Sequence, residues 1–155
     1  MVDVAARLAE HGLVLPKAAI PLAAYVPARR SGSYVYTAGQ LPYVDGVLPA
    51  TGLVGRDVSA EQAHDLARIC GLNILAAIAT VVDLSEVVGV VKLTGFVASV
   101  PEFTGQPGVV NGASELMQLV FGDAGVHARS GVGVASLPIN APVEIEAIVE
   151  IAGDR

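Results

Sequence analysis

Apolar residues recur at two different spacings along the chain, and these spacings predict its helices and strands. Over Ser59–Val82 they recur every three or four positions, which is typical of a helix with one buried face. Ser59 and Gln62 have capping-box spacing at its start. Gly71 interrupts the helix, and since a mid-helix glycine costs up to about 1 kcal/mol, we expect it to serve close packing. The apolar stripe consists of Ala63, Leu66, Ala67, Cys70, Ile74, Ala77, Ile78 and Val81.

Shorter segments complete the predicted order of elements. Residues 3–11 predict a short helix ended by Gly12, and the Pro- and Ala-rich residues 13–33 are expected to be extended. Tyr34–Gln40 alternates bulky and polar residues as a strand does. Leu41–Gly55 predicts a loop, or a hairpin with a short strand. The remaining predicted elements are a buried strand, a helix and two strands: Val87–Val100, Pro107–Phe121, Ala128–Leu137 and Val143–Ile151.

This order of elements predicts an α+β fold in one domain, residues 1–155. Each strand–helix–strand passage favours parallel neighbouring strands with a right-handed crossover, so that both helices cover one face of the sheet. The other face would be bare in a monomer. The last two strands are separated only by Pro138–Pro142, which is short enough for an antiparallel hairpin.

The composition predicts a homo-oligomer. Hydrophobic residues make up 53% of the chain and charged residues 15%, against about a quarter charged in average soluble proteins. The longest apolar stretch is Ile74–Val82, interrupted by Thr80, which is far below the roughly 20 residues that span a bilayer. We therefore expect no membrane contact and burial of the surplus apolar surface between subunits.

The charge of the chain limits the partners that we expect, and its single cysteine and first residues indicate the compartment. The net charge is −6 with nine scattered Lys and Arg and no Trp, and Arg29-Arg30 is the sole adjacent basic pair. We expect no nucleic-acid partner, because that binding depends on clustered cations. The single cysteine, Cys70, fits a reducing compartment. The first residues lack the basic start and apolar run of a secretory signal, so the cytoplasm is expected.

The segment around Arg129 is the most informative for chemistry. On a strand, Arg129 shares one face with Gly131, Gly133 and Ala135, a row almost without side chains. An arginine beside such space is suited to clamp a carboxylate through two parallel hydrogen bonds. The alternative is a solvated arginine at a strand end, with glycines that admit a neighbouring subunit.

The final strand carries Glu144 and Glu146 on one face. The predicted hairpin would bring Glu144 near Arg129, where a carboxylate can orient or deprotonate a water beside a bound ligand. This single-chain site requires both side chains on the same side of the sheet, with open space between them. Alternating glutamates also occur on solvated strands, and one of the pair is expected to be structural.

The histidines do not predict a metal site. His11, His64 and His127 have no metal-ligand spacing among themselves or with Cys70. His127 lies two residues before Arg129, so it is either at the rim of a ligand site or a solvated loop residue.

Several of these motifs resemble the reactive-intermediate deaminase (RidA/YjgF) family. The resemblance spans residues 24–151 in order, and its C-terminal part is the most specific. It rests on Tyr25, on Thr37-Ala-Gly-Gln-Leu-Pro42, on Val110-Asn111, on Arg129-Ser130 with Leu137-Pro138, and on Val143-Glu-Ile-Glu-Ala-Ile148.

The resemblance implies a chorismate-mutase-like fold with two helices on one face of a mixed sheet. It further implies a homotrimer around a β-barrel core, with ligand sites in clefts between subunits. Active members hydrolyse 2-imino or enamine acids to 2-keto acids and ammonia, without a cofactor. Arg129 would bind the carboxylate of a small acid and Glu144 would position the attacking water. The cleft would be lined by Tyr25, Ala38, Gly39, Asn111 and Gly131.

The chain departs from the family pattern at two of these positions. Ala38 stands where a serine is typical, which removes a hydroxyl, and Gly131 stands where a cysteine is common, which keeps only the backbone N–H. An N-terminal extension over residues 1–16 and a longer loop at Tyr43–Gly55 resemble a longer branch of the family. These differences leave the substrate open.

Four functions remain as hypotheses. The first is an imine and enamine deaminase that uses Arg129 and Glu144. The second is a non-catalytic trimer that binds a small carboxylic acid through Arg129 as a sensor or scaffold. The third is RNA cleavage, which the acidic charge disfavours. The fourth, chorismate mutase activity, rests on fold analogy alone.

Overall fold

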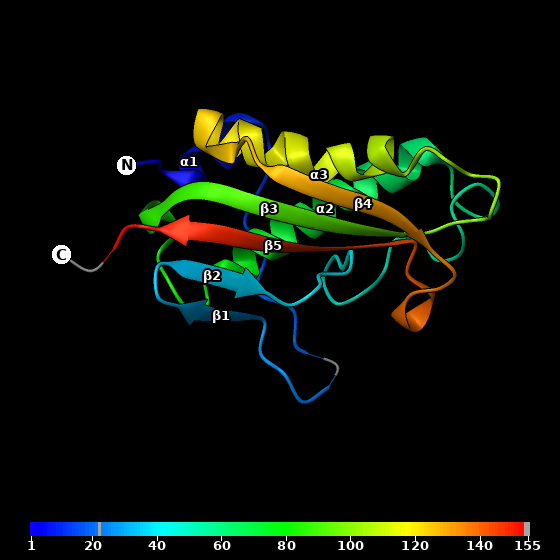
Figure 1. Cartoon of the computed structure of the whole chain (residues 1–155), viewed down its shortest axis with the longest axis horizontal. Helices are drawn as coiled ribbons and strands as arrows, with labels where there is room; N and C mark the ends of the chain where they lie inside the picture. Colours follow the sequence, from blue (N-terminus) through cyan, green and yellow to red (C-terminus); the bar gives the residue numbers. More distant parts are fainter. Residues whose placement is uncertain (22, 154–155) are drawn as a thin grey trace.

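A five-stranded mixed sheet carries the fold, with the strands in the spatial order β1-β2-β5-β3-β4 (Figure 1). The computed structural model describes residues 1–21 and 23–153. β5 is antiparallel to both of its neighbours, whereas β3 and β4 are parallel. The strands are β1 (Ala28–Ser31), β2 (Tyr34–Thr37), β3 (Val87–Ala98), β4 (Ala128–Val134) and β5 (Val143–Ile151).

Two long helices, α2 (Ala60–Ile78) and α3 (Gln106–Phe121), pack side by side behind the sheet (Figure 1). The predicted capping box opens α2: Gln62 N donates to Ser59 Oγ over 3.1 Å, and Ser59 N donates to Gln62 Oε1 over 3.0 Å. No helix in the described part of the chain is long and apolar enough to cross a membrane. The short elements are α1 (Val4–Glu10) and the 3-10 turns η1 (Leu84–Glu86), η2 (Gly122–Gly125) and η3 (Pro138–Asn140).

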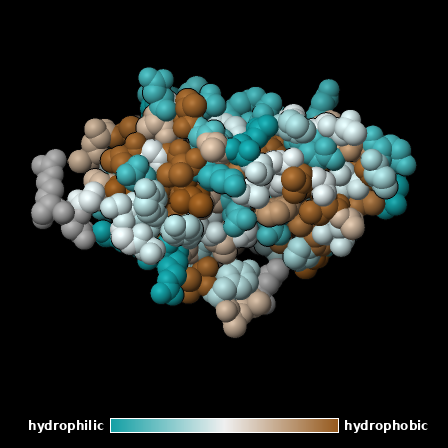
Figure 2. Space-filling model, viewed as in Figure 1, coloured by the Kyte–Doolittle hydropathy of each residue, from teal (hydrophilic) through white to brown (hydrophobic). Residues whose placement is uncertain are grey.

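The core lies between the helices and one face of the sheet, as predicted. Alternate residues of β3 and β5, such as Leu93, Val97 and Ile145, are fully buried there. The opposite face carries no helix, and Figure 2 shows hydrophobic residues scattered among polar ones across it. The large apolar side chains exposed on the strands are Tyr34, Tyr36, Val88, Val91 and Val132.

The predicted hairpin of the last two strands is wrong. β4 pairs with β3 alone, and η3 leads the chain past β3 so that β5 inserts between β2 and β3. The core-facing residues of β5 are all buried, so the strand is stabilised by neighbours on both sides. β4 contains glycines and no fully buried residue, and it lies at the edge of the sheet with one neighbouring strand.

The parallel-neighbour rule holds for one of the two helical passages. β3, α3 and β4 form the expected parallel pair. β2 and β3, joined through α2, run in the same direction but are separated by β5. The rule fails there because β5 provides a long antiparallel partner for both strands.

Several boundaries also differ from the prediction. The segment expected to be extended contains β1, which pairs with β2 in a hairpin. The predicted strand Tyr34–Gln40 ends at Thr37, and Gln40 forms a separate bridge with Ile145. The predicted strand Ala128–Leu137 ends at Val134. Leu41–Gly55 is a loop that contains isolated bridges.

Glycines set the distance between α2 and α3. A Cβ on Gly71 would lie 2.8 Å from Leu116 Cδ2, which confirms that this glycine serves close packing. A Cβ on Gly112 would overlap the carbonyl oxygen of His64. Backbone cannot yield as a flexible side chain can, so Gly112 is the more constrained of the two.

We expect Gly112→Ala to destabilise the fold by about 1–3 kcal/mol, because the added methyl forces α3 away from α2. Gly108→Ala is the matched control in the same helix, since a Cβ there has nothing within 4 Å. That control should be neutral or stabilising by up to about 1 kcal/mol. Urea denaturation of both variants measures the effect, and equal stabilities would contradict the packing argument.

Candidate functional site

Arg129, at the start of β4, reaches across to α3 and binds three neutral oxygens. Its Nη1 donates to Asn111 Oδ1 over 2.6 Å and to Ser114 Oγ over 3.2 Å. Its Nη2 donates to the carbonyl oxygen of Pro107 over 3.2 Å. The predicted neighbours Arg129 and Asn111 are therefore in direct contact.

Two residues extend this contact away from the surface. Ser114 Oγ lies 2.9 Å from His127 Nε2, and His127 Nδ1 lies 2.6 Å from the carbonyl oxygen of Gly125 in η2. Sequence reasoning left His127 open and missed Ser114, although its place one turn after Asn111 on a helix was a usable signal. We call Pro107, Asn111, Ser114, His127 and Arg129 the arginine cluster.

The glycine row beside Arg129 does not leave a vacant pocket, which corrects the prediction. A Cβ on Gly131 would lie 3.2 Å from Val110 Cγ2, and one on Gly133 would lie 2.9 Å from Gln106 Nε2. Both neighbours belong to α3. The glycines therefore let the helix approach the edge strand, as close backbone approach requires.

Arg129 and Glu144 lie on opposite faces of the sheet, so the single-chain site is wrong. Arg129 is in register with Leu93, which points into the core beneath the helices. Glu144 alternates with the buried Val143 and Ile145 and therefore faces the side without helices. The error follows from the wrong hairpin, because β3 separates the two strands.

Glu144 is half-buried beside Gly39. A Cβ on Gly39 would overlap Glu144 Oε1 and lie 2.8 Å from its Cδ, so the glycine makes room for the carboxylate. Burial, and secondarily the charge of Glu146, raise the pKa of Glu144 above its ordinary value. Glu146 thus acts here through its charge.

The other predicted residues divide between the two faces. Tyr25 and Gly39 line a cavity of about 30 Å³, and the backbone N–H of Ala38 beside it donates to Pro27 O. We call Tyr25, Ala38, Gly39 and Glu144 the glutamate cluster. The structure thus brings the predicted site together as two separate clusters, with Gly131 on the side of Arg129.

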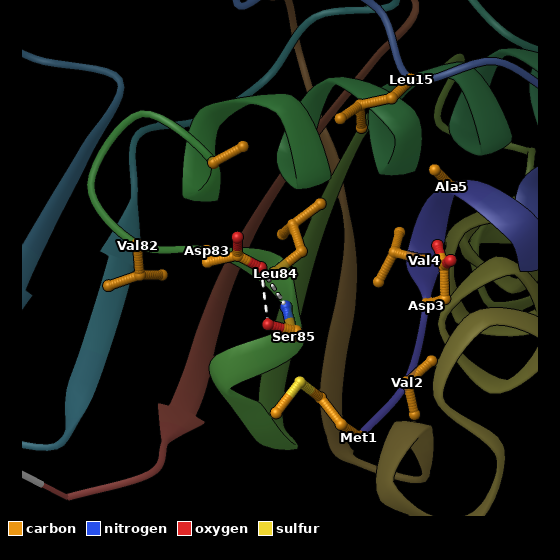
Figure 3. Close-up of a pocket in the computed structure, with 11 residues that line it drawn as sticks. Met1, Val2, Asp3, Val4, Ala5, Leu15, Val82, Asp83, Leu84 and Ser85 are labelled. Atoms are coloured by element: carbon orange, nitrogen blue, oxygen red, sulfur yellow. Dashed lines mark hydrogen bonds between the residues drawn. The ribbon is translucent and has the colours of Figure 1, made fainter.

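A hollow of about 670 Å³ shares Ala19, Ile20 and Tyr43 with the cavity beside Tyr25 and Gly39. Another, of about 520 Å³, includes no residue of either cluster and lies between the N-terminal segment and the turn before β3, with mainly apolar walls (Figure 3). Its two carboxylates cap local turns: Asp3 accepts from Ala6 N and Asp83 from Ser85 N. Among the described residues, no group of three or more His, Cys, Asp or Glu is arranged to hold a metal ion.

A mixed five-stranded sheet with its helices on one face defines an α+β fold of the YjgF type. The family model described as "YjgF/chorismate_mutase-like, putative endoribonuclease" matches residues 5–151. The chain belongs to this family, and the resemblance drawn from its motifs is confirmed.

Individual relatives cover nearly the whole chain. Protein TCP17 of Trypanosoma cruzi is 44% identical over 150 residues, which is 96% of this chain and 94% of the relative. The 2-iminobutanoate/2-iminopropanoate deaminase of Salmonella typhimurium is 36% identical over 124 residues, or 80% of this chain and 84% of the enzyme. The crystal structure of Atu1372 from Agrobacterium tumefaciens is 52% identical, with a TM-score of 0.89 over 96% of this chain and 92% of that one.

We expect Glu146→Gln to lower the pKa of Glu144 but to leave it above the ordinary value, because burial is the larger cause. A pKa raised by folding means that ionised Glu144 opposes folding above its folded pKa. This cost is absent below the unfolded pKa. A 13C NMR titration of the Glu144 carboxyl carbon measures the shift. An unchanged pKa in the variant would contradict the charge contribution.

Proposed function

We propose that the protein hydrolyses reactive 2-imino or enamine acids to 2-keto acids and ammonia, at a site shared between two copies of the chain. The observation that carries the proposal is that Arg129 and Glu144 lie on opposite faces of one sheet. Membership of a family with 2-iminobutanoate deaminases among its members supports the reaction.

Two features of the chain favour completion of the site by a second copy. β4 is an edge strand, so a neighbour can lie along it next to Arg129. The face without helices carries exposed aromatic and β-branched side chains, which are suited to burial between subunits. A copy packed on both features would bring its own Glu144 towards Arg129. A homotrimer with a β-barrel core is the closed assembly we propose.

The proposed hydrolysis requires the site to bind the substrate carboxylate and to position one water. Arg129 binds the substrate carboxylate, and Glu144 holds a water against the imine carbon. The imine is protonated on nitrogen before attack, and an enamine reaches the same cation by taking a proton on carbon. The water oxygen bonds to the imine carbon, the C=N π pair moves to nitrogen, and Glu144 takes a proton from the water, which gives a carbinolamine. Transfer of a proton to its nitrogen lets the C–N bond break, and ammonia leaves with the bonding pair. The remaining hydroxyl proton is lost as the C=O of the 2-keto acid forms.

A raised pKa suits Glu144 to this role. A carboxylate that is more basic than usual takes a proton from water more readily. Because Ala38 and Gly131 carry no polar side chain, substrate binding is left to Arg129 and backbone groups, which favours small acids without selecting one particular substrate side chain.

We expect Arg129→Ala and Glu144→Gln each to slow imine hydrolysis at least about 100-fold, since each removes one side of the shared site. Refolding the two variants together should restore activity. In a 1:1 mixed ring about a quarter of the interfaces combine an intact Arg129 with an intact Glu144. Activity is measured as 2-keto acid formed from imines that an amino-acid oxidase generates in situ.

As a control, each variant is taken through the same refolding procedure without the other. No recovery in the mixture, with both variants folded, would contradict a shared site. Equal rates with and without the wild-type protein would contradict the deaminase function.

A non-catalytic acid-binding role is the second candidate. It is favoured by the arginine cluster, which is complete within one chain and independent of Glu144. Binding of pyruvate that survives Glu144→Gln, without turnover by the wild type, would support this role over hydrolysis. The net charge of −6 gives RNA cleavage little support, despite the wording of the family description.

A further inference from the structure

We infer that Ser114 and His127 are positioning residues that hold Arg129 ready for a carboxylate. This inference rests on the proposed role of Arg129 in acid binding and extends it to two residues that do not touch the substrate. Ser114 lies in α3 and is 7% exposed. His127 lies just after η2 and just before β4, so the contact joins three elements around one guanidinium.

When the imidazole ring of His127 is neutral, the hydrogen bonds that join Arg129, Ser114, His127 and Gly125 can run in only one direction. The carbonyl oxygen of Gly125 can only accept, so His127 Nδ1 must carry the hydrogen. His127 Nε2 is then an acceptor and takes the hydroxyl hydrogen of Ser114. Ser114 Oγ keeps its lone pairs for Arg129, which can only donate. Every donor in this series of hydrogen bonds, which runs from Arg129 through Ser114 and His127 to Gly125, thus meets an acceptor.

This series decides which edge of the guanidinium is engaged. Asn111 Oδ1 and Ser114 Oγ use both hydrogens of Nη1, and Pro107 O uses one hydrogen of Nη2. Within the described part of the chain, nothing accepts a hydrogen bond from Nε. Nε–H and one Nη2 hydrogen are therefore left as donors on adjacent nitrogens, and together they can serve the two oxygens of a carboxylate.

The same series leaves the charge of Arg129 available. Its three partners are an amide, a hydroxyl and a backbone carbonyl, none of which carries a negative charge. No carboxylate among the described residues lies within ion-pair distance of it. A buried acidic partner would compete with an anionic ligand, whereas neutral oxygens fix the geometry and leave the cation for the substrate.

The test compares Ser114→Ala and His127→Leu with the wild type. Each variant breaks the series, so KM for the imine and Kd for pyruvate should rise about tenfold, while kcat stays within about twofold. The double variant should be little worse than either single one, because both act through Arg129. His127→Gln should recover most of the affinity, since its side-chain oxygen can replace Nε2 as acceptor.

Matched controls are Ser85→Ala and His11→Leu, which remove the same groups far from Arg129 and should leave KM and Kd unchanged. In the Arg129→Ala background, Ser114→Ala should have no further effect on pyruvate binding. A purely structural role would lower stability in both backgrounds and would not be rescued by His127→Gln.

The outcomes separate this inference from the proposed function. Turnover that depends on Arg129 but not on Ser114 or His127 overturns the positioning role alone. Pyruvate binding that depends on all three residues, without turnover, supports positioning and overturns hydrolysis. A wild type with neither turnover nor pyruvate binding overturns both. Nitrogen-15 NMR of His127 gives a ligand-free check: a ring protonated on Nε2 rather than Nδ1 overturns the direction of the series.

Discussion

The insertion of β5 between β2 and β3 is the constraint on which the rest of the structure depends. As the central strand, β5 directs Val143, Ile145 and Val149 into the core and Glu144 and Glu146 to the face without helices. Side chains alternate between the two faces of a strand, so a shift of β5 by one residue would exchange the two sets. The position of the candidate water-binding carboxylate is therefore a consequence of how the core is filled.

Close approach by α3 is the second condition for the site. Glycine at 112 allows α3 to contact the backbone of α2, and Gly131 allows Val110 to lie against β4. With the helix this near, Asn111 and Ser114 come within hydrogen-bonding distance of Arg129. Packing and recognition are coupled here, since a wider gap would leave the arginine to the solvent. The glycines beside Arg129, which suggested an empty pocket, instead allow α3 to pack directly against β4.

The two clusters have complementary electrostatics. The cation of Arg129 has no anionic partner in its cluster because neutral oxygens hold its side chain, and Glu144 has a raised pKa because it is half-buried beside Glu146. One cluster is prepared to bind an anion and the other to accept a proton. Their separation on opposite faces gives the proposed assembly a chemical role, since apposition of two copies would supply what one chain lacks.

Much of the fold was predictable from the sequence because its signals are local. Helical spacing and the Ser59–Gln62 box located α2, β-branched residues located β3, alternation placed the glutamates of β5 on one face, and the motifs around Arg129 and Glu144 identified the family. The order of strands was not predictable, because the short connection before β5 fits a hairpin as well as a crossing. Only the tertiary structure decided that order, and with it the faces of Arg129 and Glu144 and the partners of Ser114. Pairing between distant strands depends on the burial of many residues at once, which no single segment encodes.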